Sequence, residues 1–337
     1  MIKVTNLTKY YGNKKAVDNI SFELEDGKIY GFLGPNGAGK STTMNIMTGY
    51  IGATSGTVQI NGFDIMEEPE KAKLNIGYLP ELPPLYQDMT IDEYLTFVAE
   101  LKKVPRRERK DHVAEIVKKA GLETVHSRLI KYLSKGYKQR VGLAGALISY
   151  PDVIILDEPT VGLDPLQINE MRDLIRSLKN DHTVILSSHI MQEVSAVCDN
   201  ILIIVNGKIV ANDRTEDLIK RFTASNNTST TISYKFKADK LSVRKTLENV
   251  AEIETIKIRD NENYTIAEIT TKADADETMN SIFFACANNK IPILESNVNK
   301  KSLEDIFISF AENKVEPIIV DESTLLMEGG NDNDSDL

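Results

Sequence analysis

The sequence predicts an α/β chain in which buried parallel strands alternate with helices, followed by a small α+β domain. Continuous apolar runs of strand length, Val153–Leu156 and Thr183–Ser187, are typical of parallel strands buried on both faces. Helical patterns separate these runs, and strands that alternate with helices indicate an α/β core. After residue 232 the order of predicted elements changes to one typical of an α+β sandwich.

Residues 1–220 form the predicted first domain. Its first 33 residues predict an antiparallel β subdomain leading into a buried strand, Lys28–Leu33. A glycine-rich loop follows, and then a helical pattern over Thr42–Tyr50. Further strands are predicted at Thr57–Asn61 and Ile76–Leu79. The run Ile201–Val205, Asn206-Gly207, Lys208–Ala211 predicts a hairpin, because Asn-Gly favours the tight turn that joins two strands.

A helical insert is predicted at about residues 81–150. Thr90 and Glu93 have the spacing of a capping box at the start of one helix. A second helix, Arg107–Ala120, is expected to end at Gly121. The short basic run of Lys102-Lys103 and Arg106-Arg107 is interpreted as a solvated helix end.

The remaining chain predicts a linker at 221–231, an accessory domain at 232–313 and an acidic, disordered tail at 314–337. The linker is rich in Ser, Thr and Asn, and the tail ends in Gly, Asn, Ser and Asp. Between them the predicted order is βαββαβ, which favours a ferredoxin-like sandwich. A final helix, Ser302–Asn313, is expected to close this domain.

Composition argues against a membrane-spanning, a secreted or a nucleic-acid-binding protein. The 337 residues are 41% hydrophobic and 27% charged, and no apolar run reaches the 18 residues that would predict a membrane span. The N-terminus lacks the pattern of a signal peptide, and Cys198 and Cys286 are far apart, so a reducing cytoplasm is expected. A net charge of −10 argues against nucleic acid as a partner.

The strongest chemical signal is a glycine-rich loop between a strand and a helix. Its pattern, GxxxxGKS, lets backbone N–H groups turn inward and surround phosphates. The lysine can reach the β- and γ-phosphates of a nucleotide, and the serine hydroxyl can ligate Mg²⁺. The residues expected to bind ATP here are Gly34, Pro35, Asn36, Gly37, Ala38, Gly39, Lys40, Ser41 and Thr42.

The second signal is the acidic pair Asp157-Glu158 at the end of a buried strand. Ligands of open α/β sheets bind at the carboxyl ends of the strands, where this pair is delivered. Asp157 is expected to hold Mg²⁺, and Glu158 to orient or deprotonate the attacking water.

Residues 1 to about 215, which include these two elements, resemble the ABC ATPases. Leu133-Ser134-Lys135-Gly136-Tyr137-Lys138-Gln139-Arg140 is similar to the family's LSGGQ signature, and Pro159–Pro165 is similar to its D-loop. His189 follows a buried strand, as the family's switch histidine does. Tyr11 resembles the aromatic residue that stacks on adenine, although Tyr10 offers an alternative.

The resemblance implies an ATP- and Mg²⁺-dependent ATPase that docks head to tail with a second copy of itself or with a paralogous ATPase subunit. The catalytic residues would be Glu158, His189 and Lys40. Ser134, Lys135 and Gly136 would close the partner's nucleotide by contacting its γ-phosphate, and Asp164 would communicate across the interface.

Two positions depart from the family pattern. Lys135 stands where glycine is usual, which adds positive charge to the signature. Glu81 stands at the Q-loop position, where the family has a glutamine that contacts Mg²⁺, so Glu81 is a third expected metal residue with Ser41 and Asp157. Glutamate at this point resembles the exporter-type subunits that pair with ABC-2-type permeases.

These features predict the motor subunit of an ABC transporter, an exporter, placed peripherally on the inner face of the cell membrane beside a separate permease. The alternative is a non-transport ABC protein that acts on ribosomes or nucleic acid. The single set of motifs and the acidic charge favour the transporter, and the segment Thr42–Tyr132 is too short to hold the long coiled coil of DNA-acting relatives.

Overall fold

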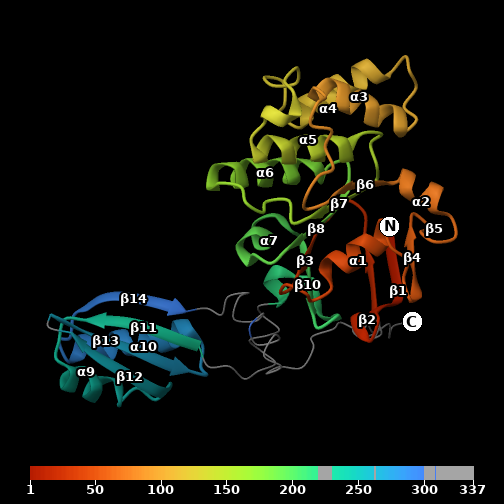
Figure 1. The fold of residues 1–337 in the computed structure, drawn as a ribbon. Helices are drawn as coiled ribbons and strands as arrows, with labels where there is room; N and C mark the ends of the chain where they lie inside the picture. The colour runs from red at the N-terminus through yellow and green to blue at the C-terminus, as the bar shows by residue number, and fades with distance from the viewer. Residues whose placement is uncertain (219–229, 262, 300–307, 309–337) are drawn as a thin grey trace, which may run out of the picture. The chain divides into compact units, whose positions relative to one another are not determined.

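The computed structural model of the protein describes residues 1–218, 230–261, 263–299 and 308 (Figure 1). These residues divide into two compact units, one within residues 1–215 and the other within residues 216–309. Most of the predicted linker at 221–231, the predicted helix Ser302–Asn313 except Ile308, and the predicted acidic tail lie outside the described residues.

The first unit is built on a six-stranded, mostly parallel sheet with the strand order β10-β9-β3-β8-β7-β6. Every residue of the central strands β3, β7 and β8 is buried, which confirms the prediction from their apolar runs. Because β6, β7, β8, β3 and β9 run parallel, their carboxyl ends meet at one edge. The bounds are β3 (Ile29–Leu33), β6 (Ile76–Leu79), β7 (Val153–Asp157), β8 (Thr183–Ser188), β9 (Asn200–Val205) and β10 (Lys208–Arg214).

A four-stranded antiparallel sheet packs against this one. Its order is β2-β1-β4-β5, with β1 (Ile2–Tyr11), β2 (Lys14–Leu24), β4 (Ser55–Ile60) and β5 (Phe63–Asp64). Helix α1 (Lys40–Met47) lies between the two sheets, and all three contribute to one apolar core that includes Leu24, Met44 and Ile204. The predicted antiparallel subdomain is thereby confirmed, and its packing holds the loop before α1 from both sides.

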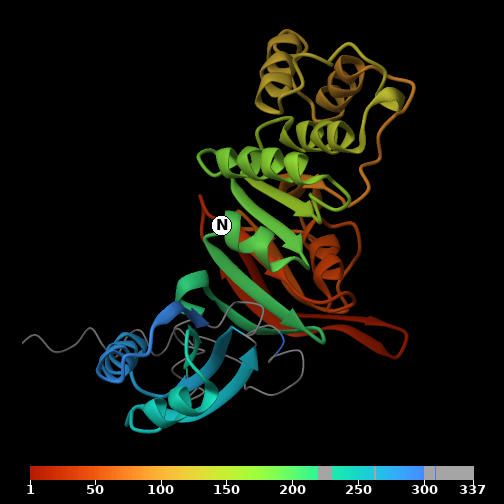
Figure 2. The same ribbon diagram turned by 90° about the vertical axis from the view of Figure 1, so that its left-hand side faces the viewer.

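The helical insert predicted near residues 81–150 is present. Figure 2 shows it gathered on one side of the first unit, away from the antiparallel strands. It contains α3 (Ile91–Leu101), α4 (Arg109–Lys119), the short 3₁₀ helix η1 (Ile130–Tyr132) and α5 (Lys135–Leu147). Thr90 and Glu93 form the predicted capping box. Three further helices pack elsewhere in this unit: α2 (Pro69–Leu74), α6 (Pro165–Leu178) and α7 (Met191–Val197).

The predicted solvated helix end is confirmed at Lys103, Arg106 and Arg107, which are exposed just after α3, but not at Lys102. Nζ of Lys102 donates a hydrogen bond to the carbonyl of Ile76 at 3.0 Å. Burial lowers the pKa of this ammonium group below its usual value. The residue ties the end of α3 to the start of β6, a contact between segments far apart in the sequence.

The second unit has the predicted βαββαβ order: β11 (Thr230–Phe236), α9 (Lys240–Leu247), β12 (Ile253–Asn261), β13 (Tyr264–Thr271), α10 (Ala275–Asn288) and β14 (Ile293–Asn299). The strands form one antiparallel sheet in the order β12-β13-β11-β14. Alternate residues of β11, Ile232, Tyr234 and Phe236, point into a core shared with both helices. This topology is the ferredoxin-like one.

Candidate active site

The glycine-rich loop leads from the end of β3 directly into α1. Gly39 has a φ of 113°, in the left-handed region that favours glycine, and it caps a helix whose first N–H groups receive no side-chain partner. A Cβ at Gly34 would lie 2.4 Å from the carbonyl oxygen of Ile204, and one at Gly39 would lie 2.6 Å from that of Ala16. The loop is therefore held close to β9 and β2, and it offers backbone N–H groups to an anion.

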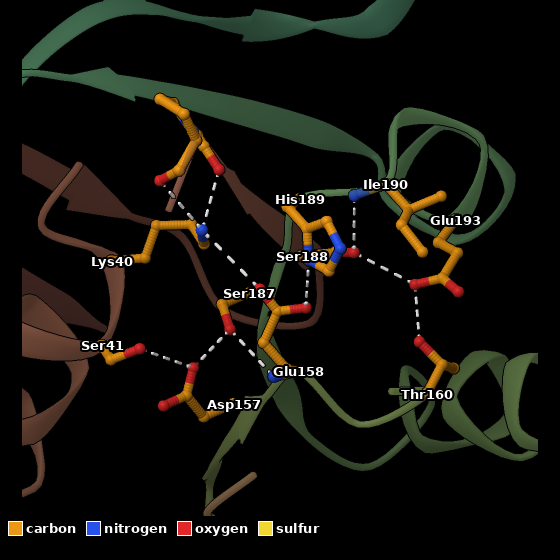
Figure 3. Close-up of polar contacts among 12 residues, drawn as sticks. Lys40, Ser41, Asp157, Glu158, Thr160, Ser187, Ser188, His189, Ile190 and Glu193 are labelled. Carbon is orange, nitrogen blue, oxygen red and sulfur yellow. Dashed lines mark hydrogen bonds and ion pairs between the residues drawn. The ribbon is translucent and has the colours of Figure 1, made fainter. Parts of the chain in front are cut away.

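Lys40 is the buried cation of this loop, with only 5% of its surface exposed. Its Nζ donates to the carbonyl of Gly34 at 2.8 Å and to that of Pro35 at 3.4 Å. The same atom lies 3.6 Å from Oε1 of Glu158 (Figure 3). The structure thus brings the predicted phosphate-binding lysine next to the predicted catalytic carboxylate.

Asp157 and Ser41 also meet at this edge. Oδ1 of Asp157 accepts hydrogen bonds from the Ser41 hydroxyl at 3.3 Å and from the Ser187 hydroxyl at 2.6 Å. One carboxylate and one hydroxyl fit Mg²⁺, which takes few protein ligands and completes its shell with water and phosphate oxygens. The described residues contain no group of three or more His, Cys, Asp or Glu placed to hold a metal ion.

Glu158 occupies an unusual backbone conformation. Its φ is 50°, in the left-handed region, and 8% of its surface is exposed. Its backbone N–H donates to the Ser187 hydroxyl at 2.9 Å, and its Oε2 lies 3.0 Å from Nδ1 of His189. Strained residues of this kind cluster at functional sites. The strained turn points the carboxylate to a position between Lys40 and His189 (Figure 3).

Sequence reasoning missed three residues that organise this cluster: Ser187, Thr160 and Glu193. Ser187 bridges Asp157 and the backbone of Glu158, as described above. Oε2 of Glu193 accepts from the Thr160 hydroxyl at 2.5 Å and from the Ser188 hydroxyl at 3.0 Å. The sequence signal for the serines was the pair Ser187-Ser188 at the end of a buried strand, just before His189, and this pair does not indicate which groups the two hydroxyls contact.

The signature residues lie apart from this cluster. Ser134 caps α5, where its hydroxyl accepts from the N–H of Tyr137 at 3.4 Å, and Lys135 and Gly136 open the helix. A Cβ at Gly162 would lie 2.2 Å from Nζ of Lys135. The lysine therefore lies against the turn that leads to Asp164, which caps α6 by accepting from the N–H of Gln167 at 2.9 Å.

Tyr11 and Glu81 are both solvent-accessible. The Tyr11 ring is 51% exposed at the end of β1 and Tyr10 is 41% exposed, so neither ring belongs to the core. The Glu81 carbonyl accepts from the side chain of Gln139 at 3.4 Å. Glu81 also lines a cavity of about 650 Å³ together with Asp157 and Tyr78, and burial raises the pKa of Tyr78 to about 12.

Fold and site together define a P-loop nucleoside triphosphatase: an anion-binding loop at a helix start, a buried lysine, and two acids where β7 ends, with β8 between β7 and β3. Residues 17–161 match the family model described as ABC transporter. The bacitracin transport ATP-binding protein BcrA of Bacillus licheniformis is 41% identical over 223 residues, 66% of this chain and 72% of that protein. The chain belongs to the family of ABC transporter ATP-binding proteins.

The chain is also similar to a relative that matches it beyond the first unit and to a cassette of known structure. The linearmycin resistance ATP-binding protein LnrL of Bacillus subtilis (strain 168) is 32% identical over 315 residues, which cover 92% of this chain and 97% of that protein. A dimeric ATP-binding cassette solved in a post-hydrolysis state with ADP and Pi is similar with a TM-score of 0.58 and 26% identity. That similarity covers 64% of this chain and 98% of the cassette.

The chain is accordingly the ATP-binding and ATP-hydrolysing motor subunit of an ABC transporter. Subunits of this family dimerise and act on a transmembrane permease. None of the helices in the described ranges is both long enough and apolar enough to cross a membrane. The alternative of a non-transport ABC protein finds no support among these relatives.

Proposed function

We propose that the chain powers an exporter, working on the inner face of the cell membrane with an ABC-2-type permease and with Mg²⁺ bound beside ATP. The observation that carries the ATP-hydrolysing part of this proposal is the meeting of Lys40, Glu158 and His189 within contacts of 3.0–3.6 Å. Hydrolysis of a γ-phosphate requires a cation to stabilise the phosphate charge and a base to activate water, and Lys40 and Glu158 are placed for these tasks beside His189.

Each residue of the site has a proposed role in binding and cleaving ATP. The loop amides and Lys40 hold the β- and γ-phosphates, and Tyr11 stacks on adenine. Glu158 orients and deprotonates the attacking water, while His189 contacts the γ-phosphate. Ser41, Asp157 and Glu81 would hold Mg²⁺, which supplies charge neutralisation to the phosphate oxygens when it is bound.

The second half of each site is proposed to come from another subunit, either a second copy or a paralogue. Ser134, Lys135 and Gly136 open α5, so their N–H groups and the lysine charge form an anion-binding surface. In the described structure they have no hydrogen bond or ion pair to Lys40, Glu158 or His189 of the same chain. The proposed arrangement is a head-to-tail dimer in which this anion-binding surface closes the partner's nucleotide, with Asp164 at the interface.

The direction of transport is proposed from two features. Glu81 occupies the position at which exporter-type subunits carry glutamate, and its cavity borders the helical insert. The relative LnrL is named for resistance to linearmycin, and removal of a compound from the cell confers resistance to it.

We place the domains at residues 1–220 and 232–313, and give the accessory domain a structural or dimerising role.

Glu81→Gln is expected to raise the Mg²⁺ concentration for half-maximal ATPase activity about fivefold. This corresponds to about 1 kcal/mol, a reasonable effect for one carboxylate in partly solvated surroundings. The measurement is a Mg²⁺ titration of the ATPase rate at saturating ATP. Glu67→Gln, an exposed position outside the site, serves as the control. Identical titrations for Glu81→Gln and the unmodified protein would remove Glu81 from the metal site.

The proposed partner can be identified with a variant that traps the ATP-bound dimer. Tagged Glu158→Gln, expressed in the native cell, is solubilised gently with ATP present and purified together with its bound proteins. Mass spectrometry is expected to find a polytopic membrane protein at equal yield, with an ABC-2-type sequence. The same purification without ATP is the control. Recovery of ribosomal proteins or nucleic acid and no membrane protein would contradict the transport proposal.

A further inference from the structure

Glu193 is a buried acid that the roles described so far do not use. It lies in α7, only 5% of its surface is exposed, and in the described part of the chain it forms no ion pair with a lysine, arginine or histidine. A carboxylate removed from water without a cation is costly unless hydrogen bonds compensate for it. Here the compensation comes from two hydroxyl groups.

Both hydroxyls donate to the same oxygen, Oε2. Thr160 donates at 2.5 Å and Ser188 at 3.0 Å, and these two donors are themselves 5% and 1% exposed. The Ser188 hydroxyl also accepts from the N–H of Ile190 at 3.0 Å. Hydrogen bonds to an ionised acceptor are roughly twice as strong as neutral ones, so a single buried oxygen holds both turns (Figure 3).

The two turns are the ones that carry the proposed catalytic groups. Thr160 lies two residues after Glu158, and Ser188 immediately precedes His189. Across the gap between them, Oε2 of Glu158 lies 3.0 Å from Nδ1 of His189. The backbone pairing of β7 with β8 ends at Asp157 and Ser187, and no backbone hydrogen bond is described between residues 158–164 and 188–190, so beyond the paired strands side chains link the two segments. Besides the contact between Glu158 and His189 and the Ser187 hydroxyl that accepts from the N–H of Glu158, Glu193 links the two segments through Thr160 and Ser188.

We infer that Glu193 is a positioning residue: its carboxylate fixes the turn of Glu158 against the turn of His189 and transmits displacement of one turn to the other. Thr160 also begins the segment that ends at Asp164, the residue proposed at the dimer interface. A change at that interface would therefore reach His189 through one shared acceptor. The inference rests on the proposed roles of Glu158 and His189.

The test compares kcat with ATP affinity in Glu193→Gln, a substitution of equal size. The amide oxygen keeps two lone pairs for the two hydroxyls, but it is uncharged and a weaker acceptor than a carboxylate oxygen, so both hydrogen bonds weaken. We expect kcat to fall about 30-fold, because small misplacements of catalytic groups cost up to about 100-fold in rate. The Kd for ATP should stay within threefold. Thr160→Val, which removes one donor at constant size, should show the same pattern more weakly.

A double-mutant cycle with His189→Ala separates positioning from a general loss of structure. If Glu193 acts by holding His189 against Glu158, Glu193→Gln should lower kcat less than threefold once His189 is absent. Ser195→Ala, in the same helix but with its hydroxyl bonded to the carbonyl of Met191, is the control and should leave kcat unchanged. An equal loss from Glu193→Gln in both backgrounds, or a parallel fall in kcat and ATP affinity, would overturn the inference.

The same data separate failure of the proposed roles of Glu158 and His189 from failure of the positioning role of Glu193. If Glu158→Gln and His189→Ala both retain normal kcat, the proposed site roles fail and the positioning role fails with them. If those two variants lose activity and Glu193→Gln does not, only the inference about Glu193 is overturned. Thermal unfolding of each variant confirms that the fold is retained, and a variant that unfolds is replaced in the comparison by Thr160→Val.

Discussion

Glu158→Gln is expected to lower the rate of ATP hydrolysis about 10²- to 10⁴-fold, the usual contribution of a positioned general base. The substitution keeps the volume of a side chain that is 8% exposed and leaves the strained turn in place. Lys40 remains 3.6 Å from the remaining carbonyl oxygen if the rotamer is kept. Removal of a negative charge next to the γ-phosphate also favours ATP binding, so the variant should accumulate as an ATP-bound dimer.

The measurement combines a phosphate-release assay with light scattering on a sizing column, with and without ATP. Glu123→Gln, an exposed acid in the helical insert, is the matched control and should hydrolyse ATP normally. A Glu158→Gln variant that stays monomeric with ATP would count against the head-to-tail arrangement. Retention of normal hydrolysis would instead remove Glu158 from its role as base.

Lys40→Met is expected to weaken ATP binding about 100-fold or more and to abolish ATP-driven dimerisation. Methionine fills the space of the buried aliphatic stem but removes the charge, and charge-assisted bonds to phosphate worth about 3 kcal/mol are lost. The carboxylate of Glu158 is then left without its cation close to the phosphates, which adds repulsion. The dimer should therefore respond in the opposite direction to that of Glu158→Gln.

Binding of a fluorescent ATP analogue, measured by titration, tests this prediction directly. Lys110→Met, at an exposed position of α4, controls for the loss of one positive charge from the chain. An affinity for ATP within threefold of the unmodified protein would show that Lys40 does not contact the phosphates. A loss of binding accompanied by unfolding would be detected by circular dichroism and would call for Lys40→Arg as a second variant.

Local patterns predicted much of the fold because their causes are local. The strand Ile76–Leu79 has the predicted bounds, and the Asn206-Gly207 hairpin forms with positive φ at both residues. Helix α1 differs: it begins at Lys40 rather than Thr42 and ends at Met47 rather than Tyr50. Left-handed glycines at 39 and 49 set these limits, and apolar periodicity does not detect backbone conformation.

The sequence by itself determined the α/β core, the order of the ferredoxin-like unit, and which residues are proposed to carry the chemistry: Lys40, Asp157, Glu158 and His189. Short motifs contain that information, since each places a reactive side chain at a fixed distance from a strand end or a helix start. Only the tertiary structure decided how these groups are held together. Ser187, Thr160 and Glu193 join strands and turns about 30 residues apart in the chain, and Lys102 joins α3 to β6. Such partnerships depend on which strands become neighbours and where each side chain points, and neither is encoded in spacing along the chain.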